Sequence, residues 1–367
     1  MLSTLDTVAL SLWTLARRKN VAAWLLPWLD ATRLRTDSAP NYLVEALSAV
    51  VGLDEIEALV PALRIEAEEA LTAATRRGID VIVWGQPAYP PLLAAIPDPP
   101  LVLWLRGRAA ALAEPSVALV GSRAGSVYGL EVAERMAEDL VSAGAAIVSG
   151  LARGVDSAAH RGALAAAGVT TAVLGSGVDR VYPPEHRRLA DAVAERGAVV
   201  SEWPPGTPPR SGNFPARNRI ISGLSLAVVV IEAAEKSGSL ITAGFALEQG
   251  REVMAVPGSV LSGRYRGCHE LIRDGAAVVE NAADVIAGLR TSTLRGVSGV
   301  AAGSEQTGQD NPVLALLPPG EAHDIDTLAA RSGLKPALLL PRLLELELQG
   351  AIRRAGGGRF VRVRRTC

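Results

Sequence analysis

The sequence has few cysteines, few histidines and no long apolar run, and each shortage argues against a class of protein. Cys268 and Cys367 stand far apart, so neither a disulfide framework nor a zinc site is expected. The four histidines show no metal-ligand spacing. No apolar run is long enough to span a bilayer, and the N-terminus lacks the pattern of a secretory signal. We therefore expect a cytoplasmic protein without a metal.

The sequence also lacks an excess of charge of either sign. Lys and Arg number 37 against 38 for Asp and Glu, a formal net charge of -1. The chain as a whole therefore has no electrostatic attraction to nucleic acid or anionic lipid, and any basic binding site must be local. With 367 residues, of which 49% are hydrophobic, the chain can form two or three domains with a sizeable core.

The first two regions differ in the spacing of their apolar residues. Residues 1–75 carry apolar residues three and four apart, with breaks expected at Pro27, Pro40 and Pro61, which predicts a helical N-terminal domain. In residues 76–288, short β-branched runs alternate with amphipathic helices. This pattern predicts an α/β domain, a Rossmann-like, doubly wound and mostly parallel sheet. We expect strands at 117–121, 145–150, 170–177, 198–202, 226–234 and 252–258, and helices at 130–142, 156–167, 185–195, 239–249 and 269–274.

The last part of the chain changes again. Residues 289–310 are rich in Gly, Ser and Thr, which predicts a flexible linker. Residues 311–367 contain three apolar helical patterns, VLALL, DTLAARSG and ALLLPRLLELELQG, and then two strands around a Gly-rich turn. That order predicts a winged-helix-like domain, although a small protein-contact or tethering module is an alternative.

The loops after the strands are the expected ligand site, because open parallel sheets bind ligands beyond the carboxyl ends of their strands. In the first loop, GSRAGS, Ser122 and Ser126 could donate to phosphate oxygens while Arg123 reaches over them, and Gly121 lets the backbone come close. In KSGSLIT, Lys236, Ser237, Ser239 and Thr242 surround a helix start, where free N–H groups favour anions. Ser239 could equally be a plain N-cap.

The spacing of these loops disfavours the common nucleotide cofactors. A dinucleotide site needs GxGxxG, whereas here Arg123 occupies the position of the second glycine, and no GxxxxGK[ST] motif occurs. No nucleophile, base and orienting residue come together in the sequence. His160 fits a structural histidine, and Asp156 fits a charge favoured by a helix dipole. We expect an anion-binding crevice without a cofactor and without catalysis.

The stretch FPARNR lies in the expected loop 201–219, ahead of an apolar helix. Proteins that bind a single nucleic-acid strand combine a basic groove with an aromatic ring, and this stretch supplies both. Phe214 would stack on a base, Arg217 and Arg219 would contact phosphates, and Asn218 would brace the loop or a base edge. Arg210 and the Arg187–Arg188 pair could extend the track, although that pair also fits a solvated helix face. The alternative for the whole stretch is a solvated loop with a buried phenylalanine.

Six motifs resemble the DNA-processing protein A (DprA/Smf) family in order and spacing. They are VALVGSRAGSVYG, SGLARGVDSAAHRGAL, TTAVLGSGVDRVYPPEHRRL, VVSEWPPGTPPRSGNFPARNRIISGLS, VVVIEAAEKSGSLITAGFALEQGREVMAVPG and RGCHELIRDGA, between about residues 117 and 288. The flanking helical and winged-helix-like segments are also similar to accessory domains of that family.

The resemblance implies an extended Rossmann-like domain that is not an enzyme. Family members bind single-stranded DNA, form dimers and help load the RecA recombinase on incoming strands during natural transformation. By the same resemblance, Arg123, Arg217 and Arg219 would grip phosphates and Phe214 would pack on a base. Backbone or hydroxyl donors would come from Gly150, Gly154, Ser237, Gly238 and Ser239.

Two positions depart from the family pattern, and two other functions stay open. His186 and His269 stand where the family usually has Asn, which could introduce a pH dependence. One alternative is a Rossmann-like nucleotide phosphoribohydrolase of the LOG or lysine-decarboxylase-like kind, with Glu248 in the role of its glutamate. The other is a regulator whose winged helix binds duplex DNA through the basic strand ending IRRAGGGRFVRVRR.

Overall fold

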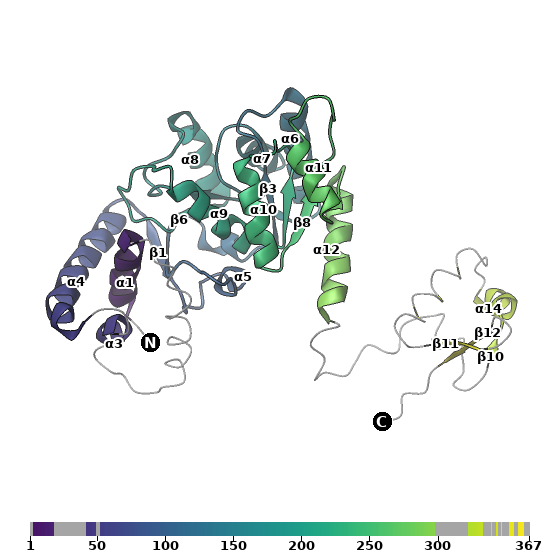
Figure 1. The fold of residues 1–367 in the computed structure, drawn as a ribbon, viewed down its shortest axis with the longest axis horizontal. Helices are drawn as coiled ribbons and strands as arrows, with labels where there is room; N and C mark the ends of the chain where they lie inside the picture. The colour runs from purple at the N-terminus through teal and green to yellow at the C-terminus, as the bar shows by residue number, and fades with distance from the viewer. Residues whose placement is uncertain are drawn as a thin grey trace. The chain divides into compact units, whose positions relative to one another are not determined.

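The structure is a computed structural model that describes most of the chain. The described residues are 3–17, 42–48, 52–297, 322–332, 352–355 and 359–362, together with Leu339, Leu343 and Leu346. They belong to two compact units, Met1–Val297 and Ser298–Cys367. Figure 1 draws both units.

A nine-stranded sheet forms the centre of the first unit, in the order β1-β2-β6-β5-β4-β3-β7-β8-β9. The strands from β6 to β9 along this order pair in parallel, whereas β2 pairs antiparallel with both β6 and β1. The mostly parallel sheet predicted from the sequence is therefore confirmed. The strand bounds are β1 Asp80–Val83, β2 Val102–Gly107, β3 Ser116–Val120, β4 Ala146–Ser149, β5 Thr170–Leu174, β6 Ala198–Ser201, β7 Ala227–Val230, β8 Glu252–Ala255 and β9 Ala277–Val278.

Helices cover both faces of this sheet (Figure 1). Alternate residues of a strand point to opposite faces, so β3 places Ala118 and Val120 in one hydrophobic cluster and Val117 and Leu119 in another. The first cluster joins the sheet to α9 (Asn213–Gly223), α10 (Gly238–Glu248) and α11 (Arg266–Arg273). The opposite face carries α6 (Val127–Ser142), α7 (Val155–Ala165), α8 (Arg187–Arg196) and α12 (Ala282–Val297). Short helices lie at α5 (Pro91–Ala94), η1 (Ala109–Leu112) and η2 (Pro184–His186).

The N-terminal helices pack on the β1–β2 end of the sheet. Trp13 of α1 (Thr4–Arg17) and Leu63 of α4 (Leu53–Arg76) share a hydrophobic cluster with Trp104 of β2, and α3 (Tyr42–Ser48) joins them. The predicted break at Pro61 is wrong, because α4 continues through it. The proline removes one backbone donor, and the buried neighbours Val60 and Leu63 hold the helix in place. Pro27 and Pro40 lie outside the described residues.

The stretch FPARNR is helical, which corrects the predicted loop 201–219. Helix α9 begins at Asn213, so Phe214, Arg217 and Arg219 all lie within it. Pro215 falls in the first turn, where backbone N–H groups have no partner inside the helix and proline costs little. The sequence interpretation treated this proline as a loop residue and so placed the helix start too late.

The second unit contains a small three-stranded sheet, and its fold class agrees with the winged-helix prediction. Strand β12 (Arg359–Arg362) pairs antiparallel with both β11 (Ile352–Ala355) and β10 (Ala322–His323). Leu328 of α14 (Ile325–Ser332) packs with Leu339, Leu343, Leu346, Ile352 and Phe360. The hairpin is as predicted, whereas β10 was not expected, and the helix predicted at VLALL lies outside the described residues.

The last helix of the first unit extends into the predicted linker. Helix α12 runs to Val297, past the point at which the linker was expected to begin, and the rest of residues 289–310 lies outside the described part. The predicted domain boundaries remain predictions. Among the described helices, none has both the length and the apolar content needed to cross a membrane.

Candidate nucleic-acid interface

A crevice opens where the sheet reverses its winding. Strands β3 and β7 are neighbours, yet β3 leads into α6 on one face and β7 leads into α10 on the other. Such a switch point leaves a ligand site beyond the carboxyl ends of the strands. The cavity there has a volume of about 830 Å³. It brings together most of the predicted site residues, namely Gly121, Ser122, Arg123, Phe214, Arg217, Asn218, Lys236, Ser237, Gly238, Ser239 and Thr242.

One wall of the crevice is aromatic. The Arg123 guanidinium carbon lies 5.5 Å from the centroid of the Phe214 ring, within the range of a cation–π contact. The Tyr182 ring lies 5.6 Å from the same ring at an interplanar angle of 43°. Phe214 is half-buried and Tyr182 is exposed. Sequence reasoning missed Tyr182, although its place in the loop after β5 was a signal that could have found it.

Arg217 forms the floor of the crevice and is only 4% exposed. Its Nη1 donates to the backbone oxygens of Gly150, at 2.8 Å, and of Val173. Its Nε donates to Asn218 Oδ1 at 3.2 Å. Burial lowers the pKa of Arg217 to about 10, while the nearby carboxylate of Asp156 acts in the opposite direction. The guanidinium therefore stays charged at neutral pH and supplies positive charge from beneath the crevice.

Asp156 sits beside this arginine as a fixed part of the floor. Its Oδ2 accepts from the backbone N–H groups of Gly150 and Ala152, at 3.2 and 3.4 Å. Burial raises the pKa of Asp156, and Arg217 opposes that rise. Its place in the first turn of α7 agrees with the charge predicted there.

A buried carboxylate holds the loop after β3 in place. Glu232, just after β7, is fully buried and accepts from the backbone N–H and the hydroxyl of Ser126. Tyr265 donates its hydroxyl to the same carboxylate at 3.2 Å. Ser126 in turn caps α6 by accepting from the Gly129 N–H at 3.0 Å. The sequence analysis missed Glu232. Its partner Ser126 lies 106 residues away in the chain, and a local pattern does not reveal such a contact.

The second predicted phosphate-binding loop lies at the start of α10. Ser237 is the N-cap, since its hydroxyl accepts from the Ser239 N–H at 3.4 Å, and the two hydroxyls lie 2.8 Å apart. The alternative that Ser239 is the plain N-cap is therefore wrong, because the N-cap lies two residues earlier. Ser239 and Thr242 lie within the first turns of this helix, with the exposed Lys236 just before it.

The other predicted site residues stand behind the crevice or away from it. The Gly150 backbone holds Arg217 and Asp156, as described. Gly154 has a φ of +77°, and a Cβ there would come within 2.1 Å of the Ser122 carbonyl oxygen. Only glycine fits this close approach of two loops. Arg210 is exposed and is not among the lining residues of the crevice.

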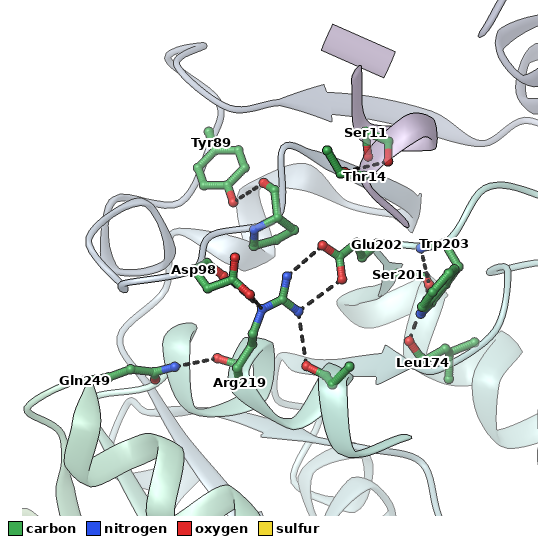
Figure 2. Close-up of polar contacts among 12 residues, drawn as sticks. Ser11, Thr14, Tyr89, Asp98, Leu174, Ser201, Glu202, Trp203, Arg219 and Gln249 are labelled. Atoms are coloured by element: carbon green, nitrogen blue, oxygen red, sulfur yellow. Dashed lines mark hydrogen bonds and ion pairs between the residues drawn. The ribbon is translucent and has the colours of Figure 1, made fainter. Parts of the chain in front are cut away.

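Arg219 is not among the residues that line the crevice. Its guanidinium points toward the carboxylates of Glu202 and Asp98 (Figure 2). Its Nη1 and Nη2 donate to the two carboxylate oxygens of Glu202, at 3.0 and 2.6 Å. Its Nε donates to Asp98 through the backbone oxygen at 2.8 Å and Oδ2 at 3.0 Å. Burial alone would lower the pKa of Arg219, but these carboxylates raise it above the ordinary value. The expected contact of Arg219 with phosphate remains a prediction, while its present partners are within the protein.

The histidines have structural partners. His160 is fully buried with Nδ1 2.7 Å from the Thr170 hydroxyl, in agreement with the predicted structural role. At the two positions that depart from the family pattern, His186 Nδ1 lies 2.9 Å from the Leu151 carbonyl oxygen, and His269 Nε2 lies 3.2 Å from that of Gly258. Both rings thus keep a hydrogen bond to the backbone. In the described part of the chain, no group of acidic, histidine or cysteine side chains could hold a metal ion.

Comparisons with known proteins agree with this geometry. A family model described as DNA recombination-mediator protein A matches residues 80–290, and one described as the DprA winged helix domain matches residues 300–358. Protein Smf of Escherichia coli K12 is 43% identical over 286 residues, 76% of each chain. DNA processing protein DprA of Bacillus subtilis is 40% identical over 265 residues, 71% of this chain and 88% of that one.

Solved structures give the same result. DNA processing protein A of Streptococcus pneumoniae is similar with a TM-score of 0.59 and 40% identity, covering 66% of this chain and 90% of that one. The protein of the same name from Helicobacter pylori, whose structure is described for its unique single-stranded DNA binding mode, has a TM-score of 0.53 and 29% identity. That match covers 58% of this chain and 96% of the other.

Proposed function

Because this chain belongs to the DNA recombination-mediator protein A family, we propose that it is a DNA-processing protein that holds single-stranded DNA in the crevice. The observation that carries this proposal is the meeting of cations, aromatic rings and backbone donors at one edge of the sheet. A single strand exposes both its phosphates and the faces of its bases, and the crevice offers a partner for each.

The roles of the residues follow from their positions. Arg123 and Lys236 are exposed at the rim and contact phosphates. The loop between β3 and α6 adds the Ser122 hydroxyl, and the N-terminus of α10 adds hydroxyl and N–H donors through Ser237 and Ser239. Phe214, with Tyr182 beside it, stacks on a base. Arg217 adds charge from the floor, and Arg219 is left out of the proposed site because carboxylates occupy its nitrogens.

The wider role is proposed on the same basis. The chain would protect incoming strands and help load RecA on them during natural transformation, acting as a homodimer in the cytoplasm. A recombination mediator of this kind works by binding. The carboxylate that lines the crevice, Asp156, accepts hydrogen bonds from backbone N–H groups. We therefore propose no catalytic step. Incubation with nucleoside monophosphates should release no free base, and release would favour the phosphoribohydrolase alternative.

The decisive experiment is fluorescence anisotropy of a labelled oligothymidine, with a duplex of equal length beside it, across a salt series. We expect tighter binding to the single strand, with an affinity that falls as salt rises. Replacing one phosphate-contacting cation by alanine should reduce the slope of log K against log salt by about 0.7, the value for one single-strand phosphate contact. Arg123→Ala and Lys236→Ala are the variants of choice, because both side chains are exposed and their loss should leave the fold intact.

Arg135→Ala is the matched control. This arginine is also exposed, at 74% of its side chain, and among the described residues it forms an ion pair with Glu131, one turn away on α6. Its removal changes net charge by the same amount and should leave the slope unchanged. Equal slopes for all three variants and the wild type would remove the crevice from the strand-binding site.

A further inference from the structure

A second cavity lies on the other flank of α9 and is separate from the crevice. Its volume is about 400 Å³, within the range of about 300–1,000 Å³ that is typical of small-molecule sites. Its walls come from α1, the segment before β2, the end of β6, and the facing sides of α9 and α10. Of the neighbouring residues of α9, Ala216 and Arg219 line this cavity, whereas Arg217 and Asn218 line the crevice.

The charged lining of this cavity is acidic. Three carboxylates reach it, those of Asp98, Glu202 and Glu248, against the single guanidinium of Arg219. Figure 2 shows that guanidinium lying between Asp98 and Glu202. All three of its nitrogens already donate to these two residues. Burial raises the pKa of Asp98, and the Glu202 charge adds to the rise while Arg219 opposes it. A positive group entering the cavity would relieve this excess of negative charge.

The uncharged lining suits an aliphatic stem. Trp203 and Phe245 contribute aromatic surface, and Pro97, Pro99 and Leu15 contribute further apolar surface. An aromatic face also attracts a cation within about 6 Å of its centre. Gln249 lines the same cavity, and its buried Oε1 has no hydrogen-bond donor among the described residues. A donor on a bound cation would pair with this oxygen.

We propose that this cavity binds a small organic cation, an ammonium or guanidinium group on a short aliphatic stem. The carboxylates of Asp98 and Glu248 receive the head group, and the aromatic wall at Trp203 and Phe245 receives the stem. Anionic ligands such as nucleotides are disfavoured by the same carboxylates, which distinguishes this cavity from the crevice. The cation could be a free amine or the side chain of a lysine or arginine in a protein. The proposal stands independently of strand binding.

Isothermal titration calorimetry with the full chain tests this proposal. Agmatine and putrescine represent free amines, and a blocked glycyl-arginyl-glycine peptide represents a side chain. We expect saturable one-to-one binding of at least one of them, and tighter binding of agmatine than of the peptide would assign the site to a free amine. 4-Guanidinobutyrate keeps the guanidinium of agmatine but has a carboxylate in place of its ammonium group. It should bind at least about tenfold more weakly than agmatine, since a charged hydrogen bond is worth about 1.5–3 kcal/mol.

Two neutralising variants locate the binding. Glu248→Gln changes an exposed side chain and should fold normally, and Asp98→Asn leaves the Glu202–Arg219 pair in place. Each should weaken the binding about tenfold. Glu138→Gln on the exposed side of α6 makes the same charge change outside the cavity and should have no effect. The proposal is overturned if none of the three cationic probes binds, or if Glu248→Gln and Glu138→Gln bind them equally well.

Discussion

Replacing Arg219 by alanine should destabilise the protein without removing the strand-binding site. The Arg219 side chain is 9% exposed, and the side chains of its partners Glu202 and Asp98 are 11% and 35% exposed. Removing the arginine leaves Glu202 buried without its partner, and breaking a buried pair in this way costs about 3–5 kcal/mol. A domain of this size loses about 2–4 °C of Tm per kcal/mol, so we expect a fall of roughly 6–20 °C.

The assay pairs thermal unfolding with anisotropy of the labelled oligothymidine, both measured well below the transition of the variant. Arg219→Ala should show a lower Tm, while its salt dependence of strand binding stays that of the wild type. Arg123→Ala should show the reverse, because its guanidinium is exposed and lines the crevice. If Arg219→Ala keeps the wild-type Tm but binds DNA with a reduced salt slope, the assignment of Arg219 to the fold is refuted.

Three other changes test separate parts of the structure. Phe214→Leu should weaken oligothymidine binding by about 1–3 kcal/mol at every salt concentration, since the change removes base stacking and leaves the charge of the site unchanged. An unchanged affinity would remove the ring from the site. Gly154→Ala should lower the Tm and the DNA affinity together, because the new Cβ would meet the Ser122 carbonyl oxygen; a variant with both values intact would contradict the close approach seen here. Burial, with smaller effects from His186 and Arg217, lowers the pKa of His160 to about 3, so the neutral ring stabilises the fold above its unfolded pKa of 6.5. That stability is lost as pH falls below 6.5, by about 2 kcal/mol between pH 7 and 5, and His160→Asn should flatten this dependence in urea unfolding curves.

Those features of the fold that depend on local pattern were predictable. Six apolar runs gave the six central parallel strands, and the helices between them appeared close to the expected positions. Continuous apolar strands occur where both faces of a sheet are covered, so this signal is direct. Pro61 and Pro215 misled the interpretation for one common reason. A proline removes one hydrogen bond at most, and burial of its neighbours or a place in the first turn of a helix makes that loss tolerable.

The candidate site was predictable in its composition but less so in its contacts. Glycines and hydroxyls after β3 and β7 could be placed at one edge, because parallel strands bring their carboxyl ends together. Glu232 was missed because its partner Ser126 lies 106 residues away in the chain. Tyr182 was missed although it lies in the loop after β5, at the same edge of the sheet. Burial of a charge is likewise invisible in sequence, so nothing in FPARNR separates an arginine that lines the crevice from one that faces a carboxylate.

The helical conformation of FPARNR explains why its two arginines differ. Successive residues of an α-helix turn by about 100°, so residues two apart point to nearly opposite sides. Arg217 therefore lies under the crevice, and Arg219 lies among the carboxylates of the second cavity. In a loop the two side chains could both have reached one phosphate track, as the sequence suggested. Because α9 is a helix, the same hexapeptide supplies Phe214 and Arg217 to the proposed strand site, and with Arg219 it ties that site to the segment before β2.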